Sequence, residues 1–131
     1  MSRDPAEELR TLEFFQRVTA RKRNIAASGS SPSVGTNLWL EAAAGGAQAL
    51  GRRMGAIAPG MRADLVVLDG KHLDLDGRRG DAIANALVFS GAKGLVRDVM
   101  VAGRWVVKER HHPKGATAGR AYKKAVAALV G

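Results

Sequence analysis

The sequence predicts an α+β fold in which three helices surround a three- or four-stranded antiparallel sheet. Three observations support this prediction. Apolar residues recur at three-to-four spacing in the first part of the chain, which is the period of an amphipathic helix. Short apolar runs bounded by turn residues follow, as expected for strands. A second helical pattern closes the chain. We therefore divide it into residues 1–54, 55–110 and 111–131.

The first helix is predicted from Pro5 to about Ala27. Asp4 is placed to accept a hydrogen bond from a first-turn amide, Pro5 suits the first helical position, and Glu7 completes the spacing of a capping box. Acidic residues come early and basic residues late, which suits the helix dipole. The stripe that recurs at helical spacing consists of Leu9, Leu12, Phe15 or Gln16, and Val18 or Thr19.

A second helix is predicted after a loop of small residues at 28–35. Thr36 or Asn37 is the expected N-cap of this alanine-rich helix, and a short last turn is expected to reach Leu50. Gly45 and Gly46 are predicted to interrupt it. This glycine pair lacks the spacing and the following lysine of a phosphate-binding loop.

The middle of the chain predicts a small antiparallel sheet. The run DLVVLD (residues 64–69) has the pattern of a strand covered on both faces, and residues 83–91 fit a helix that gives way to a strand. A hairpin is predicted next, from alternation at Val99 and Val101, a two-residue turn at Ala102 and Gly103, and a strand at residues 105–107. The tail predicts a helix with one apolar side: Ala121, Tyr122, Ala125, Val126 and Leu129.

Composition narrows the class of protein. The 131 residues carry a net charge of +9 and include no cysteine, which excludes disulfides and thiolate metal sites. No apolar run is long enough to span a membrane and no signal peptide is recognisable, so we expect a soluble, cytoplasmic protein with no membrane partner. Basic residues are scattered apart from one cluster at positions 17–23, and aromatic residues make up only 5%. A nucleic-acid partner is therefore disfavoured.

The segments at residues 45–69 and 96–107 carry a family resemblance. GGAQALGRRMGAIAPGMRADLVVLD followed by VRDVMVAGRWVV resembles the C-terminal end of a metal-dependent amidohydrolase. EELRTLEFFQRV (residues 7–18) and FSGAKGLVRDVMVAGRWVV (residues 89–107) resemble one branch of that superfamily, the formimidoylglutamate deiminases of histidine degradation. The resemblance covers nearly the whole chain. It implies that the terminal helices of a TIM-like barrel lead into part of a small β-sandwich and a C-terminal helix.

The resemblance also implies a chemistry whose residues are missing from this sequence. Such enzymes hold a divalent, zinc-like metal with an HxH pair, a later histidine and an aspartate, and the metal turns a water into a nucleophile. In the deiminases, this water attacks the formimino carbon and ammonia leaves, which gives N-formylglutamate. The sequence has no HxH motif, and the family aspartate would lie before Met1, so Asp4 is not that ligand. We expect a truncated chain that is inactive alone.

The remaining candidate residues point to no site. His111 and His112 are adjacent and would point to opposite faces of a strand. His72 lies among aspartates in KHLDLDGRRGD, but that segment lacks the ligands of an EF-hand, and a solvated loop is the simpler interpretation. The serines of the loop at 28–35 have no histidine at motif spacing. We expect no catalytic, cofactor-binding or metal-binding residue and no cofactor in this chain.

Three hypotheses for function follow. The favoured one is the C-terminal part of a deiminase-like hydrolase, which acts on a small-molecule substrate only when complete. The second is a non-catalytic assembly module that pairs its exposed sheet edge and helix faces. The third is a small basic nucleic-acid binder, whose binding would fall with a modest rise in salt. The expected partner is a second copy of the chain or the N-terminal part of the enzyme.

Overall fold

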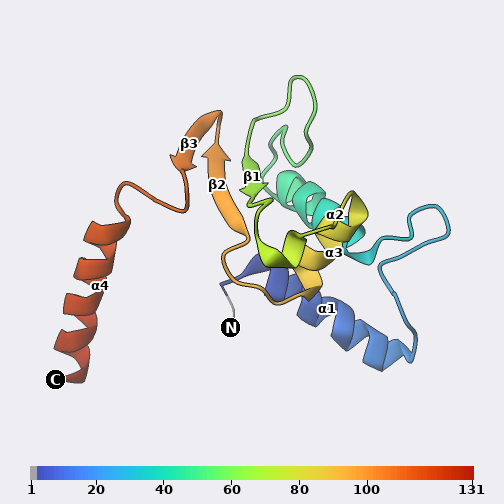
Figure 1. Cartoon of the computed structure of the whole chain (residues 1–131), viewed down its shortest axis with the longest axis horizontal. Helices are drawn as coiled ribbons and strands as arrows, with labels where there is room; N and C mark the ends of the chain where they lie inside the picture. Colours follow the sequence, from blue (N-terminus) through green and yellow to red (C-terminus); the bar gives the residue numbers. More distant parts are fainter. Residues whose placement is uncertain (1–2) are drawn as a thin grey trace. The chain divides into compact units, whose positions relative to one another are not determined.

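The computed structural model describes residues 3–131 and confirms an α+β fold. It contains four α-helices, one short 3-10 helix and a three-stranded antiparallel sheet within those residues (Figure 1). Its contacts divide the chain into two compact units. The helical unit consists of residues 3–62 and 69–95, and the sheet unit consists of residues 63–68 and 96–131. No described helix is both long enough and apolar enough to cross a membrane.

Helix α1 spans Pro5–Ala20 and begins as predicted. The Asp4 carboxylate accepts a hydrogen bond from the amide of Ala6 at 3.0 Å, and Pro5 occupies the first turn. The predicted end near Ala27 is wrong, because Arg21 adopts a left-handed conformation with φ of 51° and ends the helix. The chain then turns back as a loop over residues 21–33.

Helix α2 spans Val34–Ala49, and its N-cap is Ser33 rather than Thr36 or Asn37. The Ser33 hydroxyl accepts a hydrogen bond from the Thr36 amide, which satisfies one of the first free N–H groups of the helix. Gly45 and Gly46 do not interrupt α2, contrary to the prediction. Glycine lowers helix stability by only about 1 kcal/mol relative to alanine, and the alanine-rich neighbours continue the helix through both positions.

Helix α3 spans Asp81–Phe89 and follows the 3-10 helix η1 at Leu73–Leu75. No strand follows it within residues 83–91, where a helix giving way to a strand was expected. Helix α3 packs on both α1 and α2. The core of the helical unit is Val34, Leu38 and Val88, against which Leu9 and Trp39 are partly buried.

The sheet unit contains strands β1 (Leu65–Leu68), β2 (Val96–Val101) and β3 (Arg104–Val107), in the order β1-β2-β3. Val66 faces Val99, and Val99 faces Val107, so one apolar row crosses the three strands. Strand β1 lies at an edge of this sheet. Val66 is 47% exposed, so the expected cover on both faces of β1 is not provided by the described chain.

The hairpin between β2 and β3 forms at the predicted turn. Ala102 and Gly103 both have positive φ angles, 49° and 78°, which match the twist of a two-residue hairpin. The Asp64 carboxylate accepts a hydrogen bond from the Ala102 amide at 2.8 Å and so ties this turn to the start of β1.

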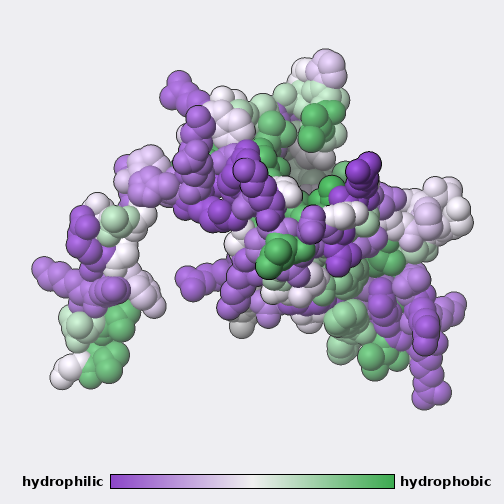
Figure 2. Space-filling model, in the orientation of Figure 1, coloured by the Kyte–Doolittle hydropathy of each residue, from purple (hydrophilic) through white to green (hydrophobic). Residues whose placement is uncertain are grey.

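Helix α4 spans Gly115–Val130, as the tail pattern predicted. None of its residues is buried. Its apolar side remains open to solvent: Tyr122 is 70% exposed and Leu129 is 86% exposed. Figure 2 shows this hydrophobic surface near the end of α4. The apolar side of α4 therefore has no cover among the described residues.

Candidate functional site

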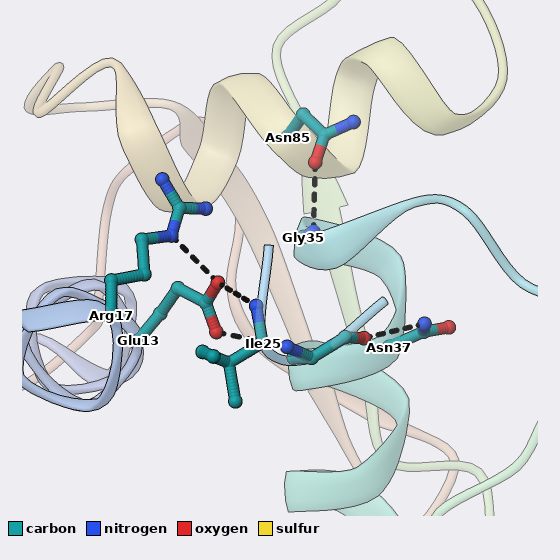
Figure 3. Close-up of polar contacts among 7 residues, drawn as sticks. Glu13, Arg17, Ile25, Gly35, Asn37 and Asn85 are labelled. Carbon is teal, nitrogen blue, oxygen red and sulfur yellow. Dashed lines mark hydrogen bonds and ion pairs between the residues drawn. The ribbon is translucent and has the colours of Figure 1, made fainter. Parts of the chain in front are cut away.

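The most elaborate polar arrangement surrounds Glu13 in the helical unit. Glu13 lies on α1, is only 1% exposed, and accepts hydrogen bonds from the backbone amides of Ile25 at 2.9 Å and Ala26 at 3.1 Å. Arg17, one helical turn further on, donates from Nε to the same carboxylate at 2.8 Å (Figure 3). A buried carboxylate is costly unless its oxygens are bonded. Here, three donors bind it, and the two loop amides among them hold the loop at residues 21–33 against α1.

Asn37 on α2 holds the other side of the same loop. Its side-chain amide donates to the carbonyls of Ala26 at 2.7 Å and Ser31 at 2.9 Å, and the Ser31 hydroxyl donates to the Asn37 side-chain oxygen. Ala26 therefore hydrogen-bonds to Glu13 of α1 through its N–H and to Asn37 of α2 through its carbonyl. This reciprocal arrangement fixes the loop between the two helices.

A close contact between α2 and α3 completes the arrangement. The Gly35 amide donates to the side-chain oxygen of Asn85 at 2.7 Å (Figure 3). The Asn85 amide donates to the Ser33 hydroxyl at 3.3 Å. A β-carbon on Gly35 would lie 2.6 Å from the Asn85 Cα. Only glycine therefore permits this approach. The Thr36 hydroxyl also donates to Asp81 at the start of α3, at 2.7 Å.

Arg17 adds an aromatic contact to this junction. Its guanidinium carbon lies 5.5 Å from the ring centres of both Phe14 and Phe89, within the range of a cation–π interaction. The two rings are themselves 5.8 Å apart. Arg17 therefore links α1 to α3 while it neutralises the charge of Glu13.

Two hollows flank this junction. One has a volume of about 450 Å³ and is lined by Glu13, Ser31, Asn37 and Glu41 among others. The second has a volume of about 390 Å³ and lies beside Arg17 and Phe89. Glu13 and Asn37 use their polar atoms to hold the loop, so the arrangement shows a structural role. It contains no nucleophile bonded to a base.

His72 serves as the cap of η1. Its Nδ1 accepts a hydrogen bond from the Asp74 amide at 3.2 Å and lies 3.3 Å from an Asp74 carboxylate oxygen. The neighbouring aspartates face different groups: Asp69 accepts from the Lys71 amide at 3.1 Å, and Asp81 accepts from Thr36. The acidic segment is therefore not gathered around one point.

His111 and His112 also take part in turns. The backbone of His111 pairs with Lys108, and Nδ1 of His112 accepts a hydrogen bond from the Lys114 amide at 3.1 Å. Both histidines are exposed. Within residues 3–131, no group of three or more histidine, cysteine, aspartate or glutamate residues is placed to hold a metal ion. These residues do not fit the divalent metal that the resemblance implies.

The loop serines are arranged as turn and cap residues. The Ser28 hydroxyl accepts a hydrogen bond from the Ser31 amide at 3.1 Å and lies 3.1 Å from the Ser30 hydroxyl. Ser33 is 6% exposed and caps α2. None of these contacts joins a serine to a histidine.

In the sheet unit, the Asp98 carboxylate has a lowered pKa. It is 6% exposed on β2, accepts a hydrogen bond from the Glu109 amide at 2.7 Å, and pairs with the Arg97 guanidinium at 2.8 Å. The Glu109 hydrogen bond first, and then the Arg97 contact, lower the pKa of Asp98 below its ordinary value. Asp98 thus anchors the turn after β3.

Sequence reasoning missed the roles of Glu13, Asn85 and Gly35. One signal was present for Glu13, because an acidic residue four positions after Leu9 lies on the apolar side of a helix only if it is bonded there. Gly35 and Asn85 are 50 residues apart. Nothing local in the sequence indicates that they meet.

The comparisons with known proteins agree with one another. Residues 15–106 match the amidohydrolase family. The chain is 47% identical over 124 residues to a formimidoylglutamate deiminase from Pseudomonas aeruginosa, which covers 95% of this chain and 27% of that protein. A crystal structure of an amidohydrolase from Brucella melitensis superposes with a TM-score of 0.82 at 34% identity, covering 96% of this chain and 27% of the other.

A second solved structure extends the likeness. A zinc-bound adenosine deaminase from Xanthomonas campestris superposes with a TM-score of 0.71 at 25% identity, covering 88% of this chain and 25% of the other. The chain thus spans about a quarter of the length of each of these proteins. Because the family match extends over more than half of the sequence, this chain belongs to the amidohydrolase family.

Proposed function

We propose that this chain is the C-terminal region of a metal-dependent hydrolase that converts formimidoylglutamate and water into N-formylglutamate and ammonia. The observation that carries the proposal is the 47% identity to a formimidoylglutamate deiminase over 95% of the chain. The likeness to an adenosine deaminase is lower, at 25% identity. The amidine substrate is therefore favoured over a purine.

The role of the chain in this enzyme is architectural. The Glu13 junction, the Gly35 contact and the Asp98 turn each stabilise the backbone with polar groups that are already bonded to one another. We assign the metal to a part of the family fold that this chain does not span. A divalent metal there, such as the zinc of the adenosine deaminase structure, would supply a water nucleophile near neutral pH.

We also propose how the elements are distributed in the complete fold. Helices α1 and α2, within residues 1–54, belong to the end of a barrel. Strands β1 to β3, within residues 55–110, form part of a sandwich, and residues 111–131 form a tail helix. Residues 69–95 pack with α1 and α2 in the helical unit, so this segment is a helical excursion between two sandwich strands. The partner of the chain is the remaining, N-terminal part of the enzyme, and the location is cytoplasmic.

A chimeric enzyme tests the proposed function. The segment of the Pseudomonas aeruginosa deiminase that aligns with this chain is replaced by this chain, and ammonia release from N-formimidoyl-L-glutamate is measured. Bound zinc is measured on the same sample by elemental analysis. The proposal expects a chimera that holds metal and releases ammonia from this substrate.

Two controls define the outcome. The first is the same deiminase without the segment, which should be inactive. The second is a chimera with the matching segment of the Brucella melitensis amidohydrolase, which shows how much activity any segment from the family restores. A chimera that folds and holds zinc but leaves formimidoylglutamate intact contradicts the proposal.

A further inference from the structure

Helix α1 is apolar on two opposite sides. Ala6 and Glu13 are buried and Leu9 is partly buried, which defines the side that faces the helical unit. At 100° per residue, Phe15 and Val18 lie on the opposite side of the helix, and Leu12 lies between the two sides. We call these three residues the outer stripe. A helix with apolar residues on both sides is typical of one that is covered on both sides.

The outer stripe is open in the helical unit. Leu12 is 49% exposed, Phe15 is 72% exposed and Val18 is 77% exposed. Figure 2 shows hydrophobic surface along α1, next to the hydrophilic side chains that follow its end. The sequence predicted this stripe as the packed face of the helix. In the structure, the stripe from Leu12 onward lacks a cover among the described residues.

The polar group beside this stripe is already satisfied. The Thr19 hydroxyl donates to the carbonyl of Phe15, one turn back, at 3.0 Å. A threonine that bonds its own helix in this way uses its hydroxyl proton within the helix. Burial of the stripe therefore leaves no unsatisfied hydroxyl donor at Thr19.

The length of the relatives identifies the occupant. The Brucella melitensis structure matches 96% of this chain, but the match is only 27% of that protein. In a complete family member, most of the polypeptide is thus available to cover α1. A second copy of this chain is disfavoured, because each copy carries a net charge of +9 and Arg21, Lys22 and Arg23 follow the stripe directly.

We infer that the outer stripe of α1 is an internal interface against the part of the amidohydrolase fold that this chain does not span. The inference rests on family membership and on the exposure of three residues. It does not require that the substrate be formimidoylglutamate, so the two proposals fail separately.

The absence of cysteine allows a clean test by thiol alkylation. A single cysteine is introduced by Val18→Cys in the outer stripe, and by Ser30→Cys in the exposed loop as a matched control. The alkylation rate at each position is measured by peptide mass spectrometry in the isolated chain and in the chimera with the Pseudomonas aeruginosa deiminase. We expect the rate at position 18 to fall at least tenfold in the chimera and the rate at position 30 to change less than twofold.

Three results would overturn the inference. The first is equal alkylation of position 18 in the chimera and in the isolated chain. The second is protection of position 18 that appears in the isolated chain as its concentration rises, which would identify a second copy as the occupant. If the chimera does not fold, a cysteine is placed instead at the aligned position of the intact deiminase. The third result is alkylation of that cysteine at a rate comparable to that of a cysteine in an exposed loop.

Discussion

Gly35→Ala should destabilise the helical unit, because α2 and α3 meet at this residue. A β-carbon at position 35 would lie 2.6 Å from the Asn85 Cα and 2.8 Å from the carbonyl oxygen of Ala84. Two of the three nearest atoms belong to the backbone, which cannot rotate away as a flexible side chain does. The helices must separate, and the bond from the Gly35 amide to Asn85 must lengthen from 2.7 Å.

The magnitude follows from three contributions. Overpacking a close contact costs about 1–3 kcal/mol, and weakening the hydrogen bond costs up to about 1 kcal/mol. Alanine in place of glycine in a helix returns at most about 1 kcal/mol. The expected net loss is therefore about 1–3 kcal/mol of the free energy of unfolding. This is a large part of the stability of a small domain, which is about 5–15 kcal/mol.

Urea denaturation followed by tryptophan fluorescence measures this loss. Trp39 packs against the core of the helical unit, while the other tryptophan, Trp105, lies on β3. Both proteins therefore carry Trp105→Phe, so that the signal reports on Trp39 alone. With a slope of about 1–2 kcal/mol per molar urea, the midpoint should fall by about 1 M.

Gly46→Ala is the matched control in the same helix. A β-carbon there meets no atom within 4 Å, so alanine should raise the stability by about 0.5–1 kcal/mol. If Gly35→Ala stabilises the protein as Gly46→Ala does, the close approach of α2 to α3 does not exist and the reasoning is refuted.

Three further predictions concern other polar contacts. Glu13→Gln should cost about 1–3 kcal/mol and speed amide hydrogen exchange at Ile25, whereas unchanged exchange would argue against the buried junction. The pKa of Asp98 is lowered in the folded state, so its stabilisation of the sheet is present above its unfolded pKa of about 3.9 and is lost as the pH falls through the folded value. Fluorescence of Trp105 should report this acid transition, and Asp98→Asn should flatten it. Ala102→Asn should stabilise the hairpin by about 0.5–1 kcal/mol, because asparagine tolerates positive φ better than alanine; a lower thermal midpoint would contradict this.

The parts of the fold that depend on neighbouring residues were predictable from the sequence. The Asp4 cap, the turn at Ala102 and Gly103, and the tail helix all arise from local chemistry, and the structure confirms them. The end of α1 was not predictable, because Glu13 draws residues 25 and 26 back onto the helix from twelve positions away. Local propensity contains no information on such a contact.

The candidate site shows the same limit. His72 and its neighbouring aspartates suggested a cluster in the sequence. In the structure, His72 caps η1 by accepting from the Asp74 amide, and Asp81, at the start of α3, accepts from Thr36. Proximity in sequence did not produce convergence in space. The family resemblance, in contrast, was readable, because it rests on strand and turn patterns that the whole family shares.

The placement of residues 69–95 between β1 and β2 has a consequence for synthesis in the cell. The amide of Asp69 bonds to the carbonyl of Leu95 at 2.8 Å, which closes this excursion at its base. Strand β1 is therefore translated roughly 30 residues before its partner, and at about 5–20 residues per second the nascent LVVL segment lacks that partner for about 1.5–6 s. During that interval, its open edge is available to chaperones or to neighbouring nascent chains. The translation rate across residues 69–95 thus sets the length of this interval without altering a single contact.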